Sequence, residues 1–245
     1  MKEENRLPEL LNDPLLRDYL SLNDRLIRLV ASRISAESEI IRNKVNENKP
    51  LEGETERILA MCSRLMQVSE LYSMLTGVIA DEPYLEAVEL SEFVGGFTKK
   101  CSELLDGVCS FEAAGADGLF VDTSRDVLTY ILLSFVRNSI LSGAETVRLE
   151  YGSSDGKCCI SAASKLVKKS GYERFGDFQR VHGDEIIAAL AARIGADCET
   201  TESSVKLTFT ASETAADSEL RSPRHEYEAS LFSEYNIMLG DLAKG

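Results

Sequence analysis

The sequence predicts an α+β fold in which an N-terminal antiparallel helical hairpin is followed by a two-layer α/β sandwich. The first observation is a stretch from Leu15 to about Asn48 without glycine or proline, followed by a heptad pattern of apolar residues over 58–79. The second is the change beyond Pro83, where helical and strand-like segments alternate with glycine-containing turns. We expect a hairpin domain over residues 1–82, a sandwich domain over 83–211 and a polar tail over 212–245.

Composition and charge exclude several classes of protein. The 245 residues are 44% hydrophobic and 28% charged, so the chain can bury a core and wholesale disorder is not expected. The formal net charge of -14 disfavours a phosphate-binding surface, so we expect no nucleic-acid partner. No apolar run reaches the roughly 18–20 residues that span a bilayer, and residues 1–5 are not those of a secretory signal. We therefore expect a cytoplasmic protein without a membrane partner.

Cysteine and histidine usage argues against a structural zinc site. The six cysteines lack CxxC spacing and are expected to be reduced thiols in small core positions. His182 and His225 are the only histidines. Any mechanism that needs histidine as a base, a metal ligand or a phosphoacceptor therefore has two candidates.

The first hairpin helix carries an apolar stripe with one charged interruption. Its apolar members fall at three- and four-residue spacing and are Ile27, Val30, Ile34 and Ile41. The position missing from the stripe is Glu37, and Pro50 and Gly53 mark the turn that follows.

The second hairpin helix has the most regular pattern of the chain. Apolar residues alternate steps of three and four over three heptads, at Ile58, Met61, Leu65, Val68, Tyr72, Leu75 and Ile79. This pattern predicts a coiled-coil seam, and a core-facing helix of one globule is the alternative. Because a lone hairpin leaves an apolar stripe uncovered, we expect a homodimer in which two hairpins form a four-helix bundle through these residues.

The remaining segments predict the sandwich and its single, locally paired sheet. Helices are expected over residues 90–105, 124–141 and 183–194, with Ser91 and Ser124 as N-caps. Strands are expected over residues 108–112, 119–121, 147–151, 157–163, 199–201 and 205–210. Residues 231–242 could dock back as a strand or a helix, or serve as a peptide-like handle for a partner.

Two segments within this layout carry motif-like residues, 31–41 (ASRISAESEII) and 132–140 (LLSFVRNSI). Together with the layout, they resemble the cytoplasmic core of sensor histidine kinases over residues 20–211. That core consists of a dimerisation and phosphotransfer hairpin and a Bergerat-type ATP-binding domain. The resemblance implies that the expected sandwich is of the histidine kinase ATPase type.

The resemblance places a phosphoacceptor box, H-E-x-x-x-P, in the first hairpin helix. Ser32 stands where the histidine should be, and Glu37 stands where the proline should be. A histidine phosphoramidate readily passes its phosphoryl group to an aspartate, whereas a serine phosphoester does not. Ser32 is therefore either a solvated helix position or, as the alternative, a different phosphoacceptor.

The resemblance also assigns a role to Asn138, because the matching asparagine of the family holds the Mg²⁺ ion that bridges the ATP phosphates. Periodicity favours an inward-facing side chain independently, since Asn138 continues the apolar face of Leu128, Ile131 and Phe135. Its partner could be Mg²⁺-ATP or a neighbouring backbone group. Ser134 occupies the family's other polar position, where a hydroxyl cannot act as a carboxylate or amide does.

The glycine-rich ATP motifs of the family are largely missing. Residues 163–169 (ASKLVKK) replace the D-x-G-x-G sequence whose aspartate binds adenine, and Gly183 alone remains of the next G-x-G loop. Asp184 and Glu185 follow it and would repel a triphosphate. Basic residues of this region could bind an anion or an acidic partner, or be solvated: Lys165, Lys168, Lys169, Arg174 and Arg180.

These observations predict a catalytically degenerate, histidine-kinase-like signalling scaffold (a pseudokinase). It would dimerise and bind a receiver domain or a kinase-type partner, and no cofactor is expected. The alternatives are an active ATP-binding kinase or ATPase with divergent motifs, a phosphotransfer protein, and an α/β protein with a coiled-coil handle and no role in signalling. In the alternative of an active kinase or ATPase, Mg²⁺-ATP would bind through Asn138 and Gly183.

Overall fold

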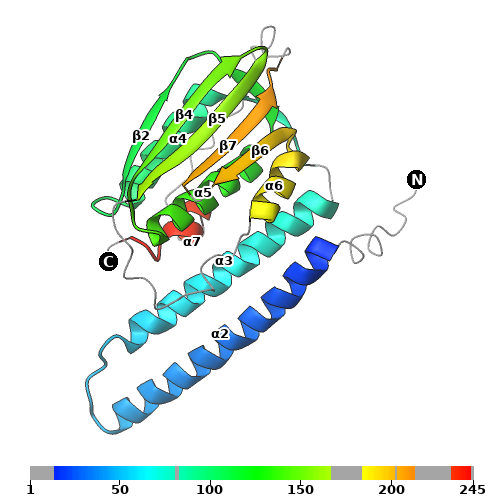
Figure 1. Ribbon diagram of the computed structural model, residues 1–245. Coiled ribbons are helices and arrows are strands. Elements are labelled where there is room, and N and C mark those ends of the chain that lie inside the picture. The colour runs from blue at the N-terminus through cyan, green and yellow to red at the C-terminus, as the bar shows by residue number, and fades with distance from the viewer. Residues whose placement is uncertain (1–13, 81–82, 167–183, 202, 213–232, 244–245) are drawn as a thin grey trace. The chain divides into compact units, whose positions relative to one another are not determined.

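The computed structural model describes residues 14–80, 83–166, 184–201, 203–212 and 233–243. The chain forms two compact units, Met1–Asp81 and Glu82–Gly245 (Figure 1). The first unit contains two long helices, and the second combines helices with a five-stranded mixed sheet. The predicted α+β fold is thus confirmed.

The helical unit is an antiparallel hairpin of α2 (Pro14–Asn46) and α3 (Glu54–Ala80) (Figure 1). Val30 of α2 and Val68 of α3 form a buried cluster, and Ile34, Met61 and Leu65 pack against it. Burial of one apolar stripe per helix stabilises such a pair far more than intrinsic helix propensity does. The helix ends lie close to the expected positions.

The second unit contains two separate sheets. Strands β2 (Ser110–Gly115), β4 (Ala144–Ser154), β5 (Lys157–Leu166), β7 (Ser204–Thr210) and β6 (Ala196–Thr201) follow one another in that order across the larger sheet. Strands β1 (Glu86–Glu89) and β3 (Phe120–Thr123) form a two-stranded antiparallel ribbon.

The expectation of one sheet with only local pairing was therefore wrong. Strand β2 pairs in parallel with β4, Ser110 opposite Thr146, and β3 pairs with β1. The first helix of the unit separates β1 from β3, and the second separates β2 from β4, so both pairings cross a helix. The sequence pattern of β1, Glu-Ala-Val-Glu, is too short to predict a strand.

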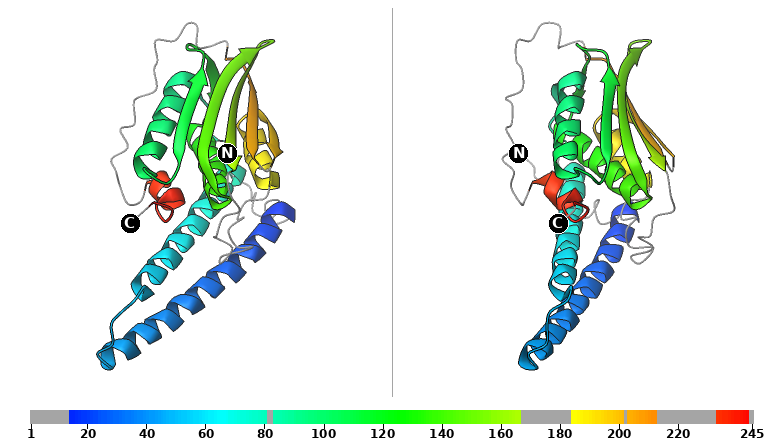
Figure 2. Two further views of the ribbon diagram at one scale, coloured as in Figure 1. Left: turned by 60° about the vertical axis from the view of Figure 1, so that its left-hand side comes forward. Right: turned by 90° about the vertical axis from the view of Figure 1, so that its left-hand side faces the viewer.

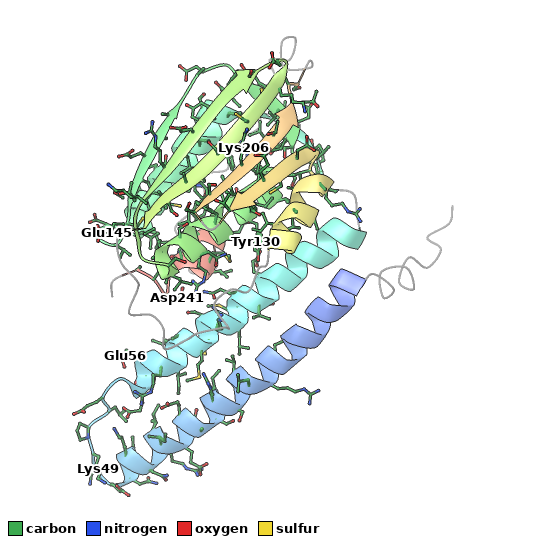
Figure 3. All side chains as sticks on the ribbon, viewed as in Figure 1. Lys49, Glu56, Tyr130, Glu145, Lys206 and Asp241 are labelled. Atoms are coloured by element: carbon green, nitrogen blue, oxygen red, sulfur yellow. The ribbon has the colours of Figure 1, made fainter. Side chains whose placement is uncertain are left out.

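The other strand pairings are local, as expected. Asp155 and Gly156 join β4 to β5 with φ angles of +53° and +74°, a conformation that suits a two-residue hairpin turn. Strand β7 pairs antiparallel with both β5 and β6. Along β7 the buried Val205, Leu207 and Phe209 alternate with outward-facing residues such as Lys206 (Figure 3).

Helices α4 (Leu90–Leu104), α5 (Arg125–Leu141) and α6 (Asp184–Arg193) cover one face of the larger sheet (Figure 2). Tyr130 of α5 is fully buried in this helical layer (Figure 3). Ser124 is the N-cap residue of α5, although its side chain makes no capping hydrogen bond. The prediction of Ser91 as N-cap was wrong, because Glu89 holds that place and the Ser91 hydroxyl donates to its carboxylate.

A short helix, α7 (Glu234–Leu239), follows the stretch 213–232 and contacts α4 and α5. Of the possibilities left open for residues 231–242, the described part from Ser233 onward forms a docked helix, and residues 231–232 lie outside the described residues.

Candidate functional site

The α2 helix presents Ser32 to solvent, two residues from the buried Val30. A phosphoacceptor must be accessible to its donor and its recipient, and position 32 meets that condition. The chemistry of the side chain does not, because a serine ester is a poor phosphoryl donor to an aspartate.

Glu37 interrupts the apolar stripe of α2 because it pairs with a cation on α3. Arg57 Nε donates to Glu37 Oε1 at 2.9 Å, and Arg57 Nη2 donates to Glu37 Oε2 at 3.2 Å. A two-point contact between a guanidinium and a carboxylate fixes the relative position of the two helices. The pair raises the pKa of Arg57, with the Glu37 hydrogen bond as the largest cause.

The hairpin turn is held by a second ionic contact. Lys44 Nζ, near the end of α2, donates to Glu54 Oε1 at 2.6 Å, and the amide of Glu52 donates to Glu54 Oε2 at 2.6 Å. These contacts lower the pKa of Glu54 to about 2, and the Lys44 hydrogen bond is the largest cause. A negative side chain in the first turn of α3 also favours the helix dipole.

The residues predicted to form a dimer interface take part in packing within one hairpin. Val68 is buried there, whereas Ile58, Met61 and Leu65 are half-buried. The side chains of Tyr72, Leu75 and Ile79 lie outside the described part of the chain. Four of the seven expected seam residues are thus buried or half-buried within a single chain, and contact with a second chain stays a prediction.

In the sandwich unit, Asn138 lies near the end of α5 and is half-buried. One turn earlier, Ser134 is only 1% exposed, and its hydroxyl has no hydrogen-bond partner among the described residues. An orphaned hydroxyl inside a protein is unfavourable and draws attention to the space beside it. These two side chains share one face of α5, as residues four apart do.

Sequence reasoning missed the polar residue next to Asn138. Arg137 is 6% exposed, which is rare for an unpaired arginine. Its Nη1 and Nη2 donate to Asp241 Oδ1 and Oδ2 at 2.6 and 2.8 Å. A signal was present, because Arg137 is the one charged residue in the apolar stretch 127–141.

The segment predicted to stand in place of an adenine-binding motif continues strand β5 as far as Leu166. Ala163, Ser164 and Lys165 pair with Arg148, Val147 and Thr146 of β4, and Ser164 N also donates to Ser203 O at 2.8 Å. A strand bonded on both sides leaves fewer free backbone groups for a ligand than a glycine-rich loop does. The predicted strand end at residue 163 was thus too early.

The other predicted ligand positions are only partly covered by the structure. Gly183, Lys168, Lys169, Arg174 and Arg180 lie outside the described residues, as do the side chains of Asp184 and Glu185. Within the described ranges, no group of three or more His, Cys, Asp or Glu side chains could hold a metal ion. None of the described helices is both long and apolar enough to cross a membrane.

A surface hollow of about 440 Å³ lies elsewhere, between the β4–β5 turn and the start of β3. Asp155, Gly156 and Phe120 are among the residues that line it. It adjoins the first residues of β5, whereas the replaced adenine motif lies at the last ones. Asn138 is not among the residues given for its lining.

Several solved structures have a similar fold. The Acinetobacter baumannii histidine kinase AdeS matches with a TM-score of 0.58 at 14% identity, over 75% of this chain and 96% of that chain. The chain has a histidine-kinase-like fold. Histidine kinase ThkA, solved in complex with the response regulator protein TrrA, matches with a TM-score of 0.55 at 16% identity, over 89% of this chain and 70% of that chain.

The histidine-kinase-like fold is thus established by shape and not by sequence. No family model matches the sequence, and no curated protein matches it significantly. At such low identity the fold is shared while each functional position has to be judged by its own chemistry. The roles that the resemblance assigns to Ser32, Asn138 and the β5 segment stay predictions.

Proposed function

We propose that this protein is a catalytically degenerate, histidine-kinase-like signalling scaffold. It dimerises through its hairpin and binds a protein partner of the two-component type, a receiver domain or a kinase. The observation that carries the proposal is the hairpin itself, which contains no histidine and has an exposed Ser32 at the phosphoacceptor position. Without an imidazole there, the phosphoramidate step of the kinase reaction has no acceptor.

The pairing of β5 with β4 and a solved complex of a similar fold support the same proposal. Ser164 and Lys165 are engaged in the β4–β5 ladder where the family has its adenine-binding aspartate and glycines. The ThkA structure contains a bound response regulator, which makes a receiver domain a reasonable partner for a chain of the same fold. A protein that keeps the docking scaffold and loses the chemistry would hold such a partner without phosphorylating it.

Nucleotide binding is the measurement that tests the proposal. Calorimetric titration of the protein with Mg²⁺-ATP is expected to show no saturable binding, and incubation with radiolabelled ATP is expected to leave no label on the protein. Micromolar binding that is lost in Asn138→Ala, but retained in the exposed hairpin control Asn43→Ala, would overturn the proposal. Label that disappears in Ser32→Ala would overturn it as well.

An active ATP-binding kinase or ATPase is the second candidate. It is favoured by the buried hydroxyl of Ser134, one turn from Asn138, which has no hydrogen-bond partner in the part of the chain that the structure describes. A bound ligand would satisfy both polar side chains at once. In that case Mg²⁺-ATP would bind at Asn138, and the calorimetric titration with Mg²⁺-ATP distinguishes the two candidates.

A further inference from the structure

Helix α7 is held on the sandwich by packing rather than by its own stability. Six residues make fewer than two helical turns, and isolated helices of that length do not persist in water. Ser233 caps the helix by accepting a hydrogen bond from Asn236 N at 3.3 Å. The stabilising area comes from five buried apolar side chains, which are Tyr235, Ile237, Met238, Leu239 and Leu242.

On the α4 side, Tyr235 contacts one aromatic and one cationic residue. The Tyr235 and Phe97 ring centroids lie 5.7 Å apart and the rings are tilted by 50°. Lys100 Nζ lies 5.2 Å from the centroid of the Tyr235 ring, within the range of a cation–π contact. Such contacts fix the orientation of the ring in addition to burying it.

On the α5 side, Arg137 binds both to α7 and to Asp241, which follows the helix. Its Nη1 donates to the Met238 carbonyl at 2.7 Å, and the guanidinium makes a two-pronged contact with the Asp241 carboxylate. Figure 3 shows Asp241 beside α7. A buried guanidinium recognises a carboxylate at one place and in one orientation, so this contact sets the register of the docked helix.

Together these contacts have the properties of a peptide-binding site, with an aromatic anchor, apolar positions and an acidic group at defined spacing. Tyr235, Met238 and Asp241 follow one another at three-residue intervals. Residues 213–232 join this segment to the residues that follow β7, so the docking of α7 is a binding event between two parts of one chain.

We propose that the surface of α4 and α5 that contacts α7 is a receptor for a short amphipathic helix, and that residues 233–242 are its resident, releasable ligand. The contacts that carry this proposal are made by Phe97, Lys100 and Arg137, and neither Asn138 nor Ser134 takes part in them. Release would expose Phe97 and Arg137 while leaving the sheet and the rest of the helical layer in place.

Competition by a peptide tests this proposal. The probe is a fluorescent peptide of residues 230–245, and its anisotropy is followed on titration with the 245-residue protein and with the Tyr235→Ala/Asp241→Asn variant. The tethered segment competes in the native protein, so the variant is expected to bind the peptide roughly tenfold more tightly or better. A peptide that carries Asp241→Asn is expected to lose this binding, and the exposed α4 control Glu103→Gln is expected to behave as the native protein does.

Two results of the peptide titration would contradict the proposal. A variant that keeps a native circular dichroism spectrum yet does not bind the peptide would overturn the proposal, as would equal binding to native protein and variant. Hydrogen exchange of the unaltered protein provides a measurement that needs no variant. Amides of α7 are expected to exchange faster than those of the centre of α5, and equal protection of the two helices would show that α7 leaves only on global unfolding.

Discussion

Glu37 and Arg57 form a two-point ion pair between α2 and α3, with Arg57 Nε 2.9 Å from Glu37 Oε1. The side chain of Glu37 is 18% exposed and that of Arg57 48%. A charged residue thus occupies a place in the apolar stripe because its partner reaches over from the facing helix. The pair specifies how far the two helices slide along each other, and it contributes modestly to their stability.

The first prediction concerns this pair. Glu37→Gln and Arg57→Gln are each expected to lower the midpoint of thermal unfolding of the hairpin slightly. Arg57→Gln also removes the contact of Arg57 with Glu54 Oε1 at 3.3 Å and is expected to be the more affected single variant. The double variant is expected to be no worse than it, since Arg57→Gln already removes the Glu37–Arg57 contact. Circular dichroism of the four proteins at low ionic strength measures the effect, and additive decreases would contradict a direct coupling.

The second prediction is a dependence on acid. Because the folded protein holds the pKa of Glu54 at about 2, below its ordinary value of 4.5, the ionised side chain stabilises the hairpin. This contribution is complete above about pH 4.5 and is lost progressively as the pH falls toward 2. Thermal unfolding between pH 6 and pH 2.5 should therefore show a smaller acid-induced decrease in Glu54→Gln than in the native protein. Parallel curves for the two proteins would refute it.

The third prediction concerns the orphaned hydroxyl of α5. Removing a buried group that lacks a hydrogen bond relieves its desolvation cost, so Ser134→Ala is expected to increase the free energy of unfolding by about 1 kcal/mol. The matched control is Thr98→Val, because the buried Thr98 hydroxyl donates to Val94 O at 2.8 Å. That variant is expected to lose about 1 kcal/mol. Denaturant titration of both variants is the measurement, and a destabilising Ser134→Ala would mean that the hydroxyl has a partner in solution.

The fourth prediction concerns thiol reactivity. Cys158 is buried and Cys159 half-buried, because neighbouring residues of β5 face opposite sides of the sheet. Burial raises the pKa of Cys158, raises that of Cys109 to about 11, and raises that of Cys101 further. Alkylation of the native protein followed by peptide mass spectrometry should label Cys159 well before Cys101, Cys109 and Cys158. Rapid labelling of Cys101 would show that the helical layer opens readily.

The fifth prediction is dimerisation through the hairpin. The Leu65→Glu/Tyr72→Glu variant places charges on the heptad seam and is expected to sediment as a monomer, while the exposed control Glu56→Gln sediments as the native dimer. Circular dichroism must show that the variant stays helical, since Leu65 also packs within its own hairpin. A native protein that sediments as a monomer, with a mass unchanged in the variant, would end the dimer argument.

Much of the fold could be predicted because its signals are local. Apolar periodicity and terminal glycines located α5 to within one residue, and the Asp155–Gly156 turn identified the β4–β5 hairpin. The pairing of β2 with β4 could not be predicted, because β3 and α5 separate the two strands in the sequence and no local pattern indicates which distant strands pair. Ser91 looked like a cap by residue type, but the helix begins at Leu90, so Glu89 holds the N-cap position.

The candidate site was predictable only in part. The resemblance drew attention to Ser32 and Asn138 because motif positions are defined in sequence. It could not indicate Arg137, whose partner Asp241 is 104 residues away. A buried ion pair becomes visible only when tertiary packing brings the two groups together.

The separation between Arg137 and Asp241 also orders the folding reaction. Contacts within β4 and β5 close loops of a few residues, whereas docking of α7 closes a loop of 104 residues, and distant contacts form later than local ones. We therefore expect the β4–β5 hairpin and α5 to form before this contact, while the Arg137 guanidinium is still hydrated. Refolding of this unit should end with a distinct late step, in which that cation loses its water and gains the Asp241 carboxylate.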